Sequence, residues 1–189
     1  MALPLLKTPF TAADYLAWEA DQTERHEFVN GEVFAMAGAE DRHVMVSLRL
    51  ASALLNHLSG TPCNVFMSDM KLSIKTLDNF FYPDIMVTCN PDDRESRMSK
   101  SEPKLIVEIL SKSTANYDRG EKFVSYRHIP SLREYVMVDI DSRQIEAYRL
   151  GDQGLWVLHP VDLRAAASTL SLASVDLTLT TEQVFAEID

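Results

Sequence analysis

The segment Lys104-Leu-Ile-Val-Glu-Ile-Leu110 is an almost continuous apolar run in the middle of the chain. Such a run is typical of a strand that other elements cover on both faces of a sheet. Glu108 interrupts it, and an ionised carboxylate buried there costs on the order of several kcal/mol unless it is paired, hydrogen-bonded, protonated or bound to a metal. The alternative is that Glu108 points to an open sheet edge or pairs with a lysine, and this stretch alone leaves both interpretations open.

A second carboxylate, Asp84, follows Pro83 at the start of the apolar stretch Ile85-Met-Val. Proline is tolerated at the start or edge of a strand, so Asp84 is expected near the end of a ladder. An ordinary Pro-Asp turn is the alternative. Two acids on neighbouring central strands would form a hard oxygen site suited to magnesium or manganese. Such a metal lowers the pKa of bound water and neutralises charge that grows on a phosphoryl oxygen.

Helices and further strands are expected on either side of these two strands. In chain order they are a short helix opened by a capping box at 11–14, a hairpin over 26–36 turning at Asn30-Gly31, a long helix stopped by Gly60 and Pro62, strands over 63–66, 70–74 and 82–88, a polar loop over 91–103, a helix over 118–129, a hairpin of strands 134–140 and 144–150, a strand over 155–158, and a terminal helix after 180–183. The stripe of the long helix expected to face the core is Val44, Leu48, Ala51 and Leu55, with Leu54 and Leu58 beside it. The order predicts a mixed α/β (α+β) domain whose central mixed sheet is flanked by helices.

Composition narrows the class of protein. The 189 residues, 46% of them hydrophobic, suffice for one domain with a substantial core. The formal charge of −10 argues against a general nucleic-acid coat protein, because phosphate affinity needs clustered lysine and arginine. Between 94 and 127, however, eight basic residues stand against five acidic ones. A local basic surface beside an acidic site is compatible with a nuclease.

The chain shows no membrane or export signal. No apolar run approaches the roughly 18 residues that a bilayer-spanning helix needs, and we expect no signal peptide because a basic region is missing before the first apolar stretch. Cys63 and Cys89 stand among apolar neighbours without metal-type spacing, and we interpret them as buried free thiols. The expected compartment is therefore the cytoplasm.

Several ordered motifs together point to a family. Pro83-Asp84 followed by Glu108-Ile-Leu and a helix that bears a lysine resembles the PD-(D/E)xK nuclease superfamily. More closely, the chain resembles the Uma-type family of restriction-like endonucleases over roughly 8–160, through the stretches at 25–34, 82–85, 107–114, 118–122 and 134–139. The resemblance implies one restriction-endonuclease-like domain over 1–189 with a core at about 40–140, an N-terminal hairpin and extra C-terminal strands.

The resemblance also implies an activity. It is metal-dependent hydrolysis of a phosphodiester in nucleic acid that leaves a 5′-phosphate and a 3′-hydroxyl. DNA is the expected substrate, and no motif in the chain separates DNA from RNA. Asp84 and Glu108 match the two metal-binding acids of the superfamily, and the backbone carbonyl of Ile109 would be a third ligand to Mg²⁺ or Mn²⁺. A homodimer is implied as well, because restriction-like nucleases often pair two sites to cut both strands.

One position departs from the superfamily pattern. The catalytic lysine normally stands two residues after the second acid, where this chain has Leu110. Lys112 keeps the strand parity of Glu108 but lies at the expected exit of the strand, whereas Lys122 lies on the following helix. We favour Lys122 because a rigid helix positions a catalytic group better than a strand exit. The alternative is a solvated Lys122 that pairs with Asp118 four residues earlier.

Five further residues are candidates for the site. Glu27 in the hairpin would add an acid on the metal side, although an exposed hairpin charge is the more ordinary interpretation. His43 would approach a phosphate, against the alternative of a polar cap or a partly buried histidine. Tyr117, Arg119 and Tyr126 are candidates for substrate contact, although all three are also ordinary packing or surface residues of a helix.

Two functions from different classes remain open on the sequence. The first is the metal-dependent endonuclease. The second is a catalytically inactive nuclease-fold module that binds nucleic acid or a protein partner, which the missing lysine at Leu110 and the overall acidity motivate. A serine or cysteine nucleophile is disfavoured, because the sequence has no Gly-x-Ser-x-Gly elbow and neither cysteine has an activating neighbour.

Overall fold

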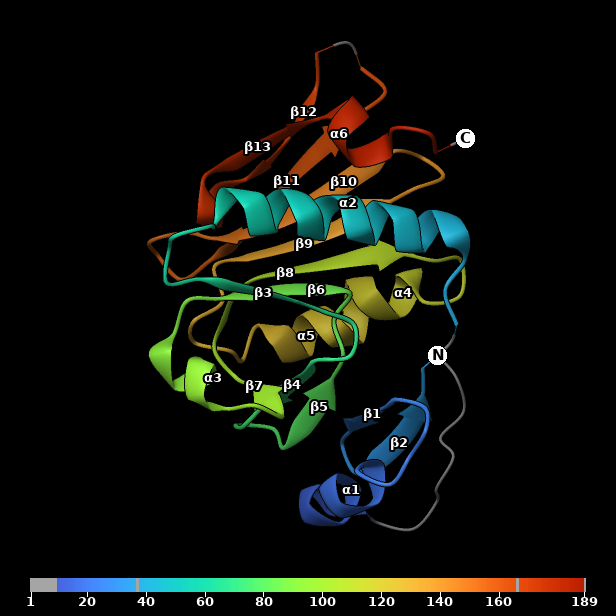
Figure 1. Cartoon of the computed structure of the whole chain (residues 1–189), viewed down its shortest axis with the longest axis vertical. Coiled ribbons are helices and arrows are strands. Elements are labelled where there is room, and N and C mark those ends of the chain that lie inside the picture. Colours follow the sequence, from blue (N-terminus) through green and yellow to red (C-terminus); the bar gives the residue numbers. More distant parts are fainter. Residues whose placement is uncertain (1–9, 37, 166, 189) are drawn as a thin grey trace.

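A mixed sheet of six strands forms the centre of the fold in the computed structural model, which describes residues 10–36, 38–165 and 167–188 (Figure 1). The strand order is β11-β10-β9-β8-β6-β3, in which β8 and β9 are parallel and the other neighbours antiparallel. The strands are β3 (Asn64–Met67), β6 (Ile85–Thr88), β8 (Pro103–Leu110), β9 (Glu134–Asp139), β10 (Gln144–Leu150) and β11 (Trp156–Asp162).

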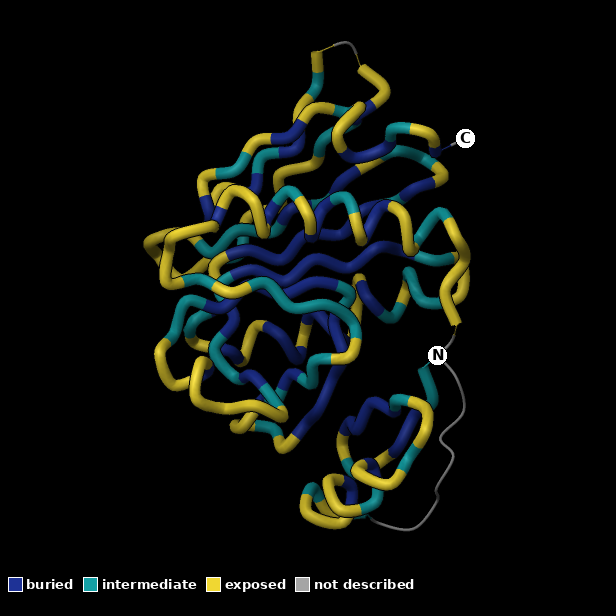
Figure 2. The backbone as a smooth tube through the Cα atoms, in the orientation of Figure 1, coloured by how far each residue is buried: buried dark blue, intermediate teal, exposed yellow. Residues whose placement is uncertain are grey.

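The apolar run around Glu108 is β8, and it is buried on both faces, as the sequence predicts (Figure 2). Side chains alternate between the two faces of a strand. Leu105, Val107 and Ile109 therefore pack into one core, and Ile106 and Leu110 pack into the other. Glu108 shares the parity of the second set and points to that side of the sheet.

Helices cover both faces of this sheet (Figure 1). The first face is covered by α2 (Asp41–His57), α6 (Thr181–Phe185) and the ribbon of β12 (Thr169–Leu172) and β13 (Leu177–Thr180), joined by the 3-10 turn η2 (Ala173–Val175). The second face is covered by a continuous helical segment made of α4 (Ala115–Tyr117), the π-helical turn η1 (Asp118–Lys122) and α5 (Phe123–Tyr126). This segment is the crossover between the parallel strands β8 and β9, and it places the helix directly over the Glu108 face.

A second sheet with the strand order β2-β1-β5-β4-β7 holds the N-terminal hairpin. Its strands are β1 (His26–Val29), β2 (Glu32–Ala35), β4 (Lys71–Ile74), β5 (Asn79–Phe81) and β7 (Ser99–Lys100). The predicted turn is confirmed: Asn30 and Gly31 have φ of 52° and 86°, and positive φ at both positions is what a type I′ turn requires. The predicted capping boxes at Thr11 and Thr180 are present on α1 (Ala12–Glu19) and α6.

The predicted core face of α2 is partly wrong. Ala51, Leu54 and the following Leu58 are buried as predicted, but Val44, Leu48 and Leu55 are exposed, and Val46 and Leu50 are buried instead. Both sets have helical spacing, so the sequence alone could not select the face that meets the sheet.

Other differences concern short elements. The segment 91–103, predicted as a loop, contains the helix α3 (Pro91–Glu95) and β7, which are tied together by the buried carboxylate of Asp93. The strands β5, β12 and β13 were not predicted, because runs of three or four residues carry little periodicity. The helix predicted over 118–129 begins earlier, at 115, and contains a π-helical turn.

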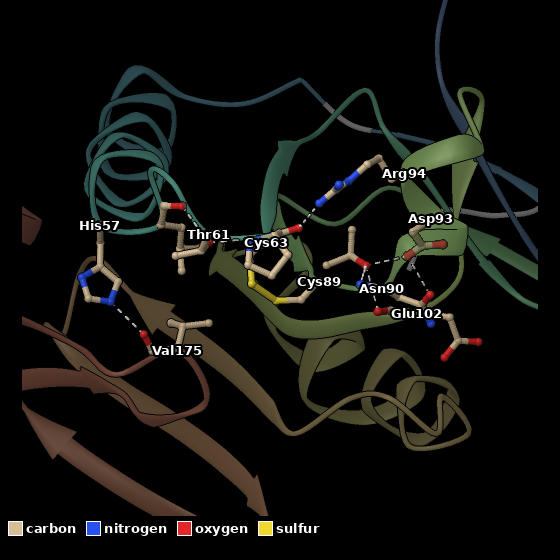
Figure 3. The surroundings of a disulfide bond; sticks show 12 residues. His57, Thr61, Cys63, Cys89, Asn90, Asp93, Arg94, Glu102 and Val175 are labelled. Carbon is tan, nitrogen blue, oxygen red and sulfur yellow. Dashed lines mark hydrogen bonds between the residues drawn. A yellow bond between two sulfur atoms is a disulfide. The ribbon is translucent and has the colours of Figure 1, made fainter.

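The interpretation of the cysteines as free thiols is also wrong. Cys63 and Cys89 form a disulfide, which Figure 3 shows beside Thr61, Asn90 and Arg94. They flank the antiparallel pair of β3 and β6, in which Asn64 faces Thr88, so the register brings residues 26 positions apart face to face. The expectation of a cytoplasmic compartment therefore loses the part of its argument that rested on free thiols. Within the described ranges, no helix is both long and apolar enough to cross a membrane.

The corrected stripe of α2 can be tested by two matched substitutions. Leu50→Ala should lower the free energy of unfolding by about 2–5 kcal/mol, because Leu50 is 0% exposed and a cavity would form. Leu48→Ala should change it by less than about 0.5 kcal/mol, because Leu48 is 54% exposed. Urea denaturation of both variants measures the difference, and equal losses would mean that the helix packs on another face.

The disulfide gives a second prediction. Reduction should lower the free energy of unfolding by about 2–4 kcal/mol, because the cross-link restricts the unfolded chain. Denaturation with and without reductant measures the change, and the double variant Cys63→Ala/Cys89→Ala should not respond to reductant. Two reactive thiols per chain in native protein that has never met a reductant would contradict the cross-link.

Candidate active site

Asp84 and Glu108 meet at neighbouring strands of the six-stranded sheet. Asp84 immediately precedes β6, and Ile85 faces Val107 in the β6–β8 register. The backbone N–H of Asp84 donates to Oε2 of Glu108 at 3.3 Å. In return, Oδ2 of Asp84 accepts a hydrogen bond from the backbone N–H of Ile109 at 2.7 Å. These two bonds fix both carboxylates against the sheet.

Lys122 reaches the same carboxylate from the helical segment above. Its Nζ donates to Oε1 of Glu108 at 3.1 Å, and the hydroxyl of Tyr126 donates to the same oxygen at 2.8 Å. Both groups come from one face of the helix, four residues apart. Glu108 therefore does not point to an open sheet edge; it is buried and paired with a lysine.

Two more carboxylates surround Lys122. Its Nζ lies 3.3 Å from Oε1 of Glu27 and 3.2 Å from Oδ1 of Asp118. Glu27 is only 6% exposed, so the interpretation of it as an exposed hairpin charge is wrong. The pairing of Lys122 with Asp118 is present, but Lys122 is buried rather than solvated. The π-helical turn over 118–122 presents both residues to the sheet, and π turns occur frequently at functional sites.

His43 enters the site from the first turn of α2. Its Nε2 lies 3.1 Å from Oδ2 of Asp84, and the ring also lies against the backbone carbonyl of Ile109. The N-cap of α2 is Glu40, so His43 is not the capping residue. It touches two of the three groups that the sequence predicts as metal ligands.

The buried charges shift one another's pKa values. Burial raises the pKa of Glu108 well above its usual range, and the carboxylates of Asp84, Asp118 and Glu27 raise it further against the opposing charge of Lys122. For Lys122, burial alone lowers the pKa, but the neighbouring acids, Glu108 first, outweigh burial and raise it well above its usual value. The lysine is therefore an ammonium ion at neutral pH, and its Nζ lies within 3.3 Å of three carboxyl groups.

These groups line a cavity of about 800 Å³. Its walls come from the hairpin, the first turns of α2, the end of β8 and the loop after it, the helical segment and the β9–β10 turn. The ionisable residues among the lining are Glu27, Glu40, Arg42, His43, Tyr82, Asp84, Glu108, Lys112, Tyr117, Asp118, Lys122 and Asp141.

Of the three other candidate residues, Lys112 and Tyr117 line the cavity and Arg119 does not. Lys112 lines the cavity, but its side chain is 88% exposed and lies 3.6 Å from Asp141 instead of near Glu108. Tyr117 lines the cavity, and its ring lies below Nζ of Lys122 at 5.7 Å. Arg119 does not line it and pairs with Asp139 and Glu146.

Two residues at the centre, Tyr126 and Asp118, have contacts or burial that the sequence does not predict. Tyr126 was considered for substrate contact, but its buried hydroxyl binds Glu108 and it cannot meet a substrate. Asp118 was considered only as a partner of Lys122. The spacing of 118, 122 and 126, four residues each, was the available signal, because it places all three on one helix face.

The carboxylates offer a donor set for a hard divalent cation. No three His, Cys, Asp or Glu side chains in the described part of the chain form a ready metal cage. Magnesium is nevertheless usually held by one or two carboxylates with several waters. Asp84 and Glu108 with the carbonyl of Ile109 match that requirement, because two carboxyl groups and a carbonyl are hard oxygen donors that the hydrogen bonds of the sheet hold side by side. Asp84, Glu108 and Ile109 therefore have the oxygen donors that a Mg²⁺ or Mn²⁺ ion would need.

Comparison with known proteins adds the family. The model of the Uma2 family, described as "Putative restriction endonuclease", matches residues 12–182. The chain belongs to the Uma2 family. Two relatives from Synechocystis sp. (strain PCC 6803) are "Uncharacterized protein slr1290", 38% identical over 91% of this chain and 89% of its own, and "Uncharacterized protein sll1609", 37% identical over 78% of this chain and 85% of its own.

A solved structure supports the fold of this Uma2-family chain. It is described as a "putative nuclease belonging to DUF820" from Anabaena variabilis, with a TM-score of 0.75 and 16% sequence identity over 94% of this chain and 98% of that one. At this identity the likeness concerns the fold. Family and fold together confirm the resemblance to restriction-like endonucleases, and the roles of the individual site residues stay predictions.

The His43–Asp84 pair predicts a measurable pKa. Burial lowers the pKa of His43, but the hydrogen bond and charge of Asp84 raise it above the ordinary 6.5. Because the folded pKa is raised, the stability that the pair contributes is fully present below about pH 6.5 and is lost as the pH rises through the folded pKa. An NMR titration of the His43 ring in metal-free protein should give a midpoint above 6.5.

The variant Asp84→Asn is the matched comparison. Without the carboxylate, burial dominates and the midpoint of His43 should fall below 6.5. The exposed His128 provides an internal reference signal in both proteins. An unchanged His43 midpoint in the variant would mean that the two side chains do not meet in solution.

Proposed function

We propose that this Uma2-family chain is an endonuclease that uses Mg²⁺ or Mn²⁺ to hydrolyse phosphodiester bonds in nucleic acid, with DNA as its substrate. The observation that carries the proposal is that Asp84 and Lys122 both bind the buried carboxylate of Glu108. Glu108 accepts from the backbone of Asp84 through one oxygen and from Lys122 through the other. Two acids and a lysine in this arrangement provide the charges that phosphodiester hydrolysis needs.

Asp84, Glu108 and the carbonyl of Ile109 would hold the cation. When bound, it would lower the pKa of a water molecule and neutralise charge on the phosphoryl oxygens. The residues around the ligands maintain the arrangement. Tyr126 holds one oxygen of Glu108, and His43 holds Oδ2 of Asp84, which also accepts from the backbone of Ile109.

Lys122 is proposed to orient the attacking water and to stabilise charge, rather than to remove a proton. Its raised pKa supports this role, because a lysine that stays protonated at neutral pH is a poor general base. Its position on the helix also supports Lys122 over Lys112, whose exposed side chain lies against Asp141. Leu110 is a buried core residue. In this proposal the catalytic lysine is Lys122 on the helix, and the position two residues after Glu108, Leu110, is apolar.

The competing function is a nuclease-fold module that binds nucleic acid or a protein without turnover. It predicts salt-sensitive binding or a stable partner complex and no product. The homodimer implied by the resemblance remains a prediction for either function, and sedimentation or light scattering would test it.

Cleavage of supercoiled plasmid with Mg²⁺ or Mn²⁺ tests the proposal. Asp84→Asn, Glu108→Gln and Lys122→Met should each lower the turnover rate by roughly 10²–10³-fold, because the first two weaken the site of the cation and the third removes a positive charge that stabilises the transition state. Lys104→Met on the same strand and Glu32→Gln in the same hairpin are matched controls that should retain activity. Full metal-dependent activity in the Asp84→Asn and Glu108→Gln variants would exclude the assigned site.

Calorimetric titration of Mn²⁺ separates metal binding from turnover. Wild-type protein should bind the metal, and the Asp84→Asn/Glu108→Gln double variant should not. Nucleic-acid binding without any product from wild-type protein, on DNA and RNA alike, would favour the non-catalytic module.

A further inference from the structure

Two basic side chains at the mouth of the cavity converge on a single carboxylate. Arg42, from the first turn of α2, donates through a terminal guanidinium nitrogen to Oδ1 of Asp141 at 2.9 Å. Lys112, from the loop after β8, lies 3.6 Å from Oδ2 of the same residue. Asp141 stands at the β9–β10 turn. The N-terminal end of α2 and the carboxyl ends of β8 and β9 lie on the same side of the molecule (Figure 1).

The charge of the cavity makes this arrangement informative. Its floor carries the carboxylates of Glu27, Asp84, Glu108 and Asp118, and Lys122 is already surrounded by three of them. A polyanionic strand that approaches this floor is repelled unless basic groups outside the floor hold its backbone. Among the described lining residues, Arg42 and Lys112 are the lysine and arginine side chains that remain for this purpose.

We propose that Arg42 and Lys112 form a phosphate clamp for a nucleic-acid strand, and that the carboxylate of Asp141 occupies the clamp until a backbone phosphodiester replaces it. The inference rests on the proposed function and names the part of the cavity that holds the substrate backbone beside the scissile bond. A carboxylate and a phosphodiester each present two oxygens that share one negative charge. An arginine and a lysine that converge on the first are therefore placed to bind the second.

The exchange is feasible because the three side chains are solvent-accessible. The Arg42 and Asp141 side chains are 36% and 48% exposed, and exposed ion pairs contribute little to stability. Breaking the Arg42–Asp141 ion pair therefore costs little free energy when a substrate phosphate displaces Asp141. Arg42 lies on α2 and Lys112 lies on the loop after β8, whereas Asp141 lies on the β9–β10 turn. The two basic side chains can therefore keep their places when the side chain of Asp141 leaves them.

Equilibrium binding in a chelating buffer tests the clamp without cleavage. The probes are fluorescein-labelled duplex DNA, single-stranded DNA and RNA of one sequence. The double variant Arg42→Gln/Lys112→Gln should bind about tenfold more weakly at about 0.1 M salt, and the slope of log affinity against log salt should fall by about one, because one phosphate contact is lost. A loss on either DNA or RNA supports the clamp and identifies the strand that it holds.

Asp141→Asn supplies the opposite change. It should strengthen binding several-fold in otherwise wild-type protein, because the competing carboxylate is gone. In the Arg42→Gln/Lys112→Gln background it should have no effect, because there is no clamp left to compete for. The exposed pair Asp162 and Arg164, which does not line the cavity, gives the matched controls Asp162→Asn and Arg164→Gln.

Three outcomes would overturn the inference. They are unchanged affinity in the double variant, an equal effect of Asp141→Asn in both backgrounds, and equal effects in the Asp162 and Arg164 controls. Each of them leaves plasmid cleavage by wild-type protein untouched, so the clamp can fail while the nuclease stands. Conversely, the expected binding changes in a protein without turnover would establish the clamp and reject the nuclease.

Discussion

The buried carboxylate of Glu108 is the constraint on which the rest of this structure depends. Its strand lies in the middle of the six-stranded sheet, covered on both faces, so the charge cannot reach bulk water. It is tolerated because Lys122 and Tyr126 bind one oxygen and the backbone of Asp84 binds the other. Removing any of these partners leaves a buried charge unsatisfied, which is why the local fold and the candidate chemistry depend on the same contacts.

The parallel connection between β8 and β9 makes that pairing possible. A crossover between parallel strands must pass over a face of the sheet, and here it passes over the face to which Glu108 points. The helical segment of the crossover then supplies Asp118, Lys122 and Tyr126 at intervals of four residues. Lys122 therefore reaches Glu108 from this helix, whereas the residue two positions along the strand, Leu110, is buried in the core.

The site keeps more acid than its own bases can neutralise. Packing alone would favour a neutral residue at Glu108, whose pKa burial and neighbouring acids raise. Retaining these acids in the core costs stability, and in the proposed function the return is a site for a divalent cation. The same acids would repel a nucleic-acid backbone, which is why the proposed phosphate clamp uses Arg42 and Lys112, the more exposed basic residues of the cavity lining.

Several features of the fold follow from residues that are neighbours in the sequence. The apolar run of β8, the Asn30-Gly31 turn and the two capping boxes depend on neighbouring residues, and the ordered motifs identified the family and the two acids. Only the tertiary structure decided which apolar stripe of α2 meets the sheet, because Leu48 and Leu50 fit a helix equally well and differ only in what covers them. It also decided that Cys63 faces Cys89 and that Glu27 and His43 join the carboxylates, because those contacts depend on strand register and on the path of the chain between elements, which no local pattern records.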